Sequence, residues 1–131
     1  MSLHPGPLPP PSTCPTVPGG GAVLVFDGVV RPTEGGTPIA GLAYQVYEPM
    51  TGRELQNLAT SIVNRFGLLA LHAVHSVGEV PNHGTSFRLR VVAAHRREAI
   101  DAADTFIVEM KRVVPIWKLP IRAHPPTHAG S

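Results

Sequence analysis

The sequence predicts an α+β fold in which a mixed or antiparallel sheet carries helices packed on it. Apolar and β-branched stretches indicate four strands, and two windows with apolar residues at steps of three and four indicate helices. The order along the chain is β-β-α-β-β-α, without the regular β-α-β crossovers of a doubly wound parallel sheet. The 131 residues are enough for one domain and leave no room for two.

The predicted elements follow one another closely in the middle of the chain. In order, they are strands at residues 21–31 and 39–47, a helix at 53–66, strands at 68–77 and 85–94, and a helix from about 95 to 114. Thr51 is a candidate cap for the first helix, and Gly67 is its stop signal. Pro115 ends the second helix. The face of that helix with apolar periodicity carries Ile100, Ala103, Ile107, Met110 and Val114.

The two ends of the chain differ in composition from the middle. Residues 1–20 hold seven prolines and three glycines, and residues 123–131 are rich in proline and histidine. Such stretches bury little and do not build helices or central strands. We therefore expect two flexible tails around a single folded domain at residues 21–122.

Composition excludes several classes of protein. The net charge of +2 and an aromatic content of 5% argue against a nucleic-acid binder. No apolar run is long enough to cross a membrane, and no secretory signal precedes the domain. The single cysteine, Cys14, excludes a disulfide framework, and the seven histidines lack a metal-binding pattern. We expect a cytoplasmic protein without a metal or another cofactor.

The basic residues are concentrated in the C-terminal part, where an anionic ligand would bind. Residues 21–87 carry a net charge of −2, whereas residues 88–131 carry +4. His95 and Arg96 lie where a strand meets the N-terminus of the last helix, a place suited to binding phosphate. Arg31 lies where the first strand enters a glycine-rich loop.

The two lysines are the sharpest signal for chemistry. A chain with nine arginines places its only lysines, Lys111 and Lys118, around Pro115 and Trp117. The segment after Pro115 should be extended, with Trp117 as a partly buried anchor, so that both ammonium groups converge on one pocket. Two close cations lower each other's pKa, which would make one lysine an acid or base.

Each signal also has an ordinary structural interpretation. A lysine in a last helical turn is usually a surface residue that favours the helix dipole. Arg88 and Arg90 fit a solvated strand face, and His72 and His75 are more often hydrogen-bonded or exposed strand residues than ligands. No nucleophile-elbow sequence supports a serine hydrolase, and Cys14 lies in the tail.

Taken together, five segments resemble the MoaE family, the large catalytic subunits of molybdopterin synthase. They are GAVLVFDGVVR (21–31), YQVYEPM (44–50), HSVGEV (75–80), AAHRREA (93–99) and MKRVVPIWK (110–118). The segments occur in the family's order and cover essentially the whole folded part. The His-Arg pair at a strand–helix junction, combined with K-x₃-P-x-W-K, is specific.

The resemblance implies a sulfur-transfer enzyme with an α/β-hammerhead type of fold. Such a subunit forms a homodimer within a heterotetramer, and each end binds a small ubiquitin-like sulfur carrier similar to MoaD. The carrier's C-terminal Gly-Gly thiocarboxylate delivers sulfur to cyclic pyranopterin monophosphate to make molybdopterin, a step of molybdenum cofactor biosynthesis. By this resemblance Lys111 and Lys118 are catalytic, while Arg31, His95 and Arg96 bind the substrate.

The chain departs from the family pattern after the second lysine. The family continues there with a basic residue and a glutamate, whereas Leu119 and Pro120 follow here. The family's C-terminal extension, which contributes to the pocket of the dimer mate, is short in this chain. The alternative hypothesis is therefore a non-catalytic relative that binds a carrier tail or a phosphorylated pterin. Retention of both lysines favours the enzyme.

Overall fold

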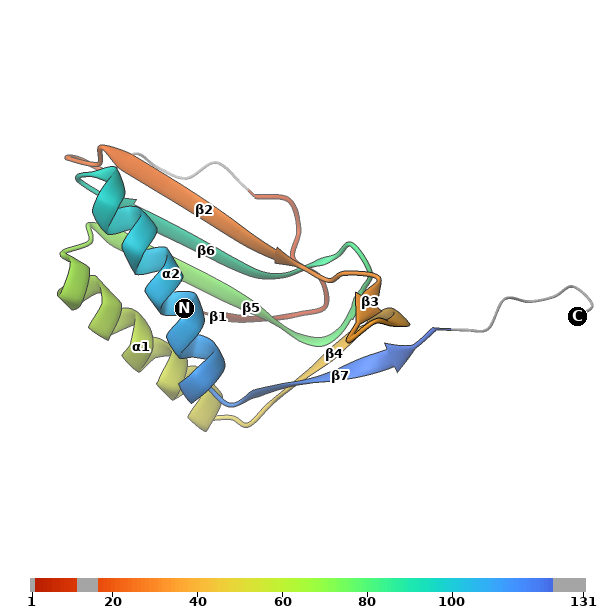
Figure 1. The fold of residues 1–131 in the computed structure, drawn as a ribbon. Coiled ribbons are helices and arrows are strands. Elements are labelled where there is room, and N and C mark those ends of the chain that lie inside the picture. Colours follow the sequence, from red (N-terminus) through yellow and green to blue (C-terminus); the bar gives the residue numbers. More distant parts are fainter. Residues whose placement is uncertain (1, 12–16, 124–131) are drawn as a thin grey trace, which may run out of the picture.

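The structure, a computed structural model, describes residues 2–11 and 17–123. It contains two helices and seven strands in this part of the chain (Figure 1). In chain order they are β1 Ser2–Pro5, β2 Ala22–Val29, β3 Thr33–Glu34, β4 Thr37–Val46, α1 Met50–Phe66, β5 Ala70–Pro81, β6 Thr85–Ala93, α2 Arg96–Val113 and β7 Ile116–Arg122. The α+β class is confirmed, and the predicted β-β-α-β-β-α order is present with β1, β3 and β7 added to it.

The seven strands form one mixed sheet. Five of them follow the order β2-β6-β5-β4-β3, with β1 paired to β5 and β7 paired to β4. All pairings are antiparallel except that of β1 with β5. Strand β2 has only β6 as a neighbour, so its other edge is unpaired among the described residues.

Strand β5 joins two parts of this sheet. Its residues 70–75 pair with β6, and its residues 78–81 pair with β4. Gly78 stands at the change of partner with a φ of +86°, a conformation that suits glycine. The strand predicted at residues 68–77 therefore ends later than expected, because it continues through Gly78 to Pro81.

Both helices lie side by side on one face of the sheet (Figure 1). The main core fills the space between them and strands β5 and β6, and its fully buried members include Leu55, Ile62, Leu89 and Phe106. A smaller cluster joins Val30, which follows β2, to Ile39 and Leu42 of β4 and Val80 of β5. Burying these apolar side chains is the main force that fixes the helices on the sheet.

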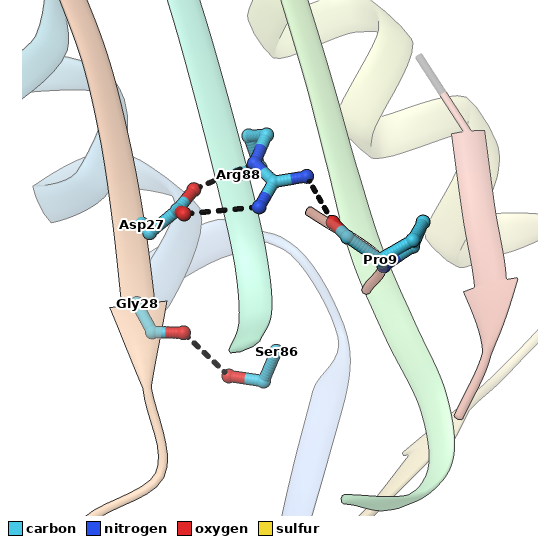
Figure 2. Close-up of polar contacts among 5 residues, drawn as sticks. All are labelled: Pro9, Asp27, Gly28, Ser86 and Arg88. Atoms are coloured by element: carbon cyan, nitrogen blue, oxygen red, sulfur yellow. Dashed lines mark hydrogen bonds and ion pairs between the residues drawn. The ribbon is translucent and has the colours of Figure 1, made fainter. Parts of the chain in front are cut away.

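Residues 2–9 pack on the sheet, although the composition of the N-terminal segment predicted a flexible tail. Residues 2–5 form β1, with Leu3 aligned to His75 of β5, and Leu8 is buried. Arg88 of β6 donates one hydrogen bond to the Pro9 carbonyl (2.7 Å) and two to the Asp27 carboxylate (2.7 and 3.0 Å), as Figure 2 shows. Arg88 is therefore not a simply solvated strand residue, because its hydrogen bonds connect β6 to β2 and to the N-terminal segment. Cys14 and the expected tail from residue 124 onward lie outside the described residues.

Two details of the helices also differ from expectation. Helix α1 begins at Met50 with Pro49 as its N-cap residue, so Thr51 lies inside the helix and is not its cap. Gly67 ends α1 with a φ of +62°, as predicted. In α2 the buried stripe runs through Ala99, Ala102, Ala103, Phe106 and Met110, while Ile100 is 51% exposed. The apolar periodicity therefore predicted the helix correctly but assigned some of the wrong residues to its buried face.

Candidate active site

A cavity of about 450 Å³ lies where the end of β2, strand β4, the last turn of α2 and the start of β7 meet. Three cationic residues line it: Arg31, Lys111 and Lys118. The remaining wall is largely apolar and includes Val30, Leu42, Phe87, Met110 and Ile116. Three cations beside an apolar wall suit a ligand that combines a flat organic part with a phosphate or carboxylate.

Each cationic residue comes from a fixed element. Arg31 directly follows Val30, whose side chain is almost fully buried, so the backbone at the end of β2 is anchored. Lys111 lies in the last turn of α2, and Lys118 lies in β7 opposite Tyr44 of β4. The predicted convergence of the two lysines on one pocket is what the structure shows, and Arg31 lines the same pocket.

The short turn from α2 into β7 sets the relation between the two lysines. The Val114 amide donates to the Met110 carbonyl (3.1 Å), and the Ile116 amide donates to the Val114 carbonyl (2.9 Å). The path after Pro115 is extended, as expected. The expected anchoring by Trp117 is wrong, because this side chain is 60% exposed and only its edge approaches the Tyr47 ring. Anchoring comes instead from the Thr51 hydroxyl, which donates to the Pro115 carbonyl (2.7 Å).

A polar group of three residues forms the inner part of the cavity. The Tyr44 hydroxyl donates to Ser86 Oγ (3.0 Å), and the His75 ring meets the Tyr44 ring edge-on, with 4.9 Å between centroids. His75 Nδ1 lies 2.8 Å from the Ser76 carbonyl, an acceptor, so Nδ1 carries the proton in the neutral ring. Burial lowers the pKa of His75, although its backbone hydrogen bond acts in the opposite direction. His75 is therefore a neutral, hydrogen-bonded strand residue.

One acidic residue also lines the cavity and was not singled out from the sequence. Glu34, at the end of β3, places Oε1 3.1 Å from the Lys118 ammonium. It is a lone acid in a glycine-rich loop, with no motif around it. Only the folding of β3 back onto β4 brings it to β7, so no local sequence pattern could have identified it.

His95 and Arg96 lie far from this cavity in the same chain. Both are exposed at the N-terminus of α2, where His95 Nδ1 is 3.6 Å from Glu98. Fifteen residues of helix separate Arg96 from Lys111, which is about 22 Å at the usual rise per residue. Within one chain, the structure brings together three of the five predicted site residues and not the other two.

Two further properties of the described residues bear on the classes considered above. Neither α1 nor α2 has the length and apolar character needed to span a bilayer. In residues 2–11 and 17–123, no group of three or more His, Cys, Asp or Glu side chains is arranged to hold a metal ion.

Comparisons with known proteins find similarity to one family. The family model described as MoaE protein matches residues 12–113. The molybdopterin synthase catalytic subunit of Aspergillus fumigatus is 36% identical over 101 residues, covering 77% of this chain and 54% of its own length. The Arabidopsis thaliana protein of the same name is 33% identical and is covered over 52% of its length. The chain thus spans about half the length of these curated relatives.

Solved structures of similar proteins share the fold of this chain. Molybdopterin synthase from Staphylococcus aureus matches with a TM-score of 0.75 at 30% identity, covering 82% of this chain and 79% of that one. A complex of subunits 1 and 2 of the molybdopterin-converting factor from Helicobacter pylori matches with a TM-score of 0.65 at 28% identity, covering 84% and 76%. The arrangement of helices and strands seen here is therefore shared with these proteins.

Proposed function

This chain belongs to the MoaE family, and from that membership we propose that it is the catalytic subunit of a molybdopterin synthase. It would transfer sulfur from a small thiocarboxylated carrier subunit to cyclic pyranopterin monophosphate in the cytoplasm. The observation that carries the proposal is the meeting of Arg31, Lys111 and Lys118 in one cavity with an apolar wall. The likeness to the Helicobacter pylori two-subunit complex supports a small protein as partner.

The three cations suit the charges that this reaction presents. Arg31 offers a planar fork of donors that can hold the phosphate of the pterin. The carrier's sulfur attacks a side-chain carbon of the pterin and displaces an oxygen, which leaves protonated, so that a thioester joins carrier and pterin. Water then attacks the thioester carbonyl, a nearby ammonium stabilises the negative charge that develops on its oxygen, and the intermediate collapses to the carrier's carboxylate and a thiolate on the pterin. Lys111 is the first candidate for this role and for protonating the leaving oxygen, with Lys118 as the second. Sulfur arrives on the carrier, so the cavity itself needs no thiol.

We also propose that His95 and Arg96 act in the cavity of a second copy of the chain. Two features support a symmetric dimer on this side of the molecule. The outer edge of β2 is unpaired among the described residues, and the outer face of α2 bears Ile100 and Val108, which are 51% and 57% exposed.

Symmetry then decides what the second copy contributes. A twofold axis that runs perpendicular to α2 beside it sets the two α2 helices antiparallel, so the N-terminus of one lies near the C-terminus of the other. His95 and Arg96 of the partner subunit would then lie beside Lys111 and complete the phosphate site. This arrangement gives a role to the two predicted site residues that are remote within a single chain.

The decisive experiment is reconstitution of the reaction. The protein is mixed with a thiocarboxylated carrier subunit and cyclic pyranopterin monophosphate, and the dithiolene product is measured after oxidation to its fluorescent form. We expect product from the wild type and none from Lys111→Ala. Binding of the carrier without any product would instead support the non-catalytic binding module, and absence of both would contradict the proposal.

A further inference from the structure

The candidate cavity contains a charge that its proposed substrates do not explain. Glu34 is the one acidic side chain among its lining residues in the described part of the chain. A carboxylate in a site for phosphate and thiocarboxylate repels both ligands and weakens their binding. Its position therefore requires a reason other than direct contact with substrate.

The backbone holds Glu34 in place through a tight hairpin. Glu34 in β3 pairs with Thr37 in β4, and Gly35 and Gly36 form the two-residue turn between them. Both glycines have positive φ, +57° and +83°, as the favoured two-residue hairpin turn requires. The Ile39 amide also donates to the Pro32 carbonyl (3.0 Å) across the base of the hairpin. The carboxylate is thus presented by a short, defined structure.

The partner of Glu34 is Lys118, one of the two proposed catalytic lysines. Their charged atoms are 3.1 Å apart, and the side chains are 31% and 56% exposed. An ion pair with this much solvent contact contributes little to stability. The ion pair does restrict the position of the Lys118 ammonium, because a lysine side chain without a partner rotates about several bonds.

We propose that Glu34 is a positioning residue that holds the Lys118 ammonium at the cavity until the carrier's C-terminal thiocarboxylate replaces it. This inference rests on the proposed function and adds to it an exchange of counter-ions at Lys118. Lys111 has no ion-pair partner among the described residues. Glu34 thereby distinguishes two otherwise similar lysines: Lys118 receives the incoming anion, and Lys111 remains available for proton transfer.

Competitive labelling of the two lysines tests the ion pair independently of any activity. Because Lys111 and Lys118 are the only lysines, limiting acetic anhydride followed by trypsin and mass spectrometry gives their labelling ratio. Arg112 provides a cleavage site between them. In Glu34→Gln we expect labelling of Lys118 relative to Lys111 to rise about two- to fivefold, and in Glu34→Asp to stay near the wild-type ratio. An unchanged ratio in Glu34→Gln would overturn the proposal.

The exchange of counter-ions at Lys118 is then tested by the binding of a synthetic peptide that ends in a Gly-Gly carboxylate. Removing the competing carboxylate in Glu34→Gln should tighten its binding about two- to fivefold, as measured by calorimetry. Glu79→Gln, which removes an exposed acid elsewhere on the sheet, should leave it unchanged. Equal or weaker binding in Glu34→Gln would contradict an exchange at Lys118.

Measurements of turnover distinguish a positioning role of Glu34 from a purely structural one. With carrier and pterin substrate, we expect Glu34→Gln to lower both kcat and the KM for the carrier, and Glu34→Asp to restore kcat. A raised KM with unchanged kcat would overturn the assignment. If the wild type itself gives no product, the proposed function fails, whereas the labelling result still decides whether Glu34 holds Lys118.

Discussion

The Thr51 hydroxyl donates a hydrogen bond to the Pro115 carbonyl at 2.7 Å, joining the start of α1 to the turn between α2 and β7. Thr51 is fully buried, and its Oγ1 also accepts a hydrogen bond from the Tyr47 amide (2.8 Å). Pro115 lies between Lys111 and Lys118 in the chain. One buried hydroxyl on a distant helix therefore helps to fix the angle at which the two lysines enter the cavity.

Replacing this hydroxyl should affect both stability and catalysis. In Thr51→Val the Pro115 carbonyl and the Tyr47 amide lose their partner, and we expect the free energy of unfolding to fall by about 2–3 kcal/mol. We also expect kcat to fall, because the turn between the lysines is released. Thr51→Ser keeps the hydroxyl and is the matched control. Denaturant unfolding and the reconstitution assay measure the two effects, and a Thr51→Val protein with wild-type kcat would show that the turn needs no such anchor.

Lys111→Ala should abolish turnover while leaving the fold intact. Lys111 is exposed in the last turn of α2, so its truncation costs little stability, within about 0.5 kcal/mol. Loss of a proton donor or oxyanion-stabilising group typically lowers the rate by about 10²–10⁴-fold. Arg112→Ala, the next residue, is equally exposed but does not line the cavity, and it should keep near-normal activity. Equal losses in the two variants would point to general charge rather than to Lys111.

Much of this site could be predicted from the sequence because its strongest signals are local. Lys111, Pro115 and Lys118 lie within eight residues, and a helix that stops at a proline is enough to bring its flanking lysines together. Arg31 follows a strand whose alternation is clear. The position of each of these residues follows once its own helix or strand is predicted correctly.

What could not be predicted depends on contacts between distant segments. Glu34 reaches Lys118 only through the β3–β4 hairpin and the pairing of β4 with β7. The N-terminal segment forms β1 because β5 offers an unpaired edge and Arg88 binds the Pro9 carbonyl, neither of which its proline-rich composition indicates. Ile100 was assigned to the core face because apolar periodicity alone does not show which of a helix's apolar residues face the sheet.

Burial of His75 should make stability depend on pH. Its pKa in the folded protein is lowered from 6.5, so the unfolded chain binds the proton first as the pH falls. The stability that the neutral ring contributes is fully present above about pH 6.5 and is lost below it, by at most about 1.4 kcal/mol per pH unit. His75→Asn, which retains a donor for the Ser76 carbonyl, should reduce this slope between pH 7 and 5. His72→Asn on the exposed face of β5 is the control, and equal slopes in the two variants would contradict the prediction.

Breaking the contacts of Arg88 should release the N-terminal segment. In Arg88→Ala, Asp27 and the Pro9 carbonyl both lose their partner, and we expect a loss of about 1–2 kcal/mol in the free energy of unfolding. Amide hydrogen exchange in residues 2–8 should become faster, because without Arg88 the segment is held mainly by the pairing of β1 with β5. Arg90→Ala, on the same face of β6, is the control. Unchanged exchange in Arg88→Ala would show that pairing with β5 suffices.

Mixing two inactive variants tests whether the active site is shared between copies of the chain. Lys111→Ala lacks the proposed catalytic group, and Arg96→Ala lacks the phosphate ligand proposed for the other subunit's cavity. In a mixed dimer, one cavity pairs an intact Lys111 with an intact Arg96 of the partner subunit, while the other cavity lacks both. Random association makes half of the dimers mixed, so refolding the two variants together should restore up to about one quarter of wild-type activity. If each cavity used only its own chain, the mixture would stay as inactive as its components. If Arg96→Ala alone kept wild-type activity, Arg96 would have no part in the reaction.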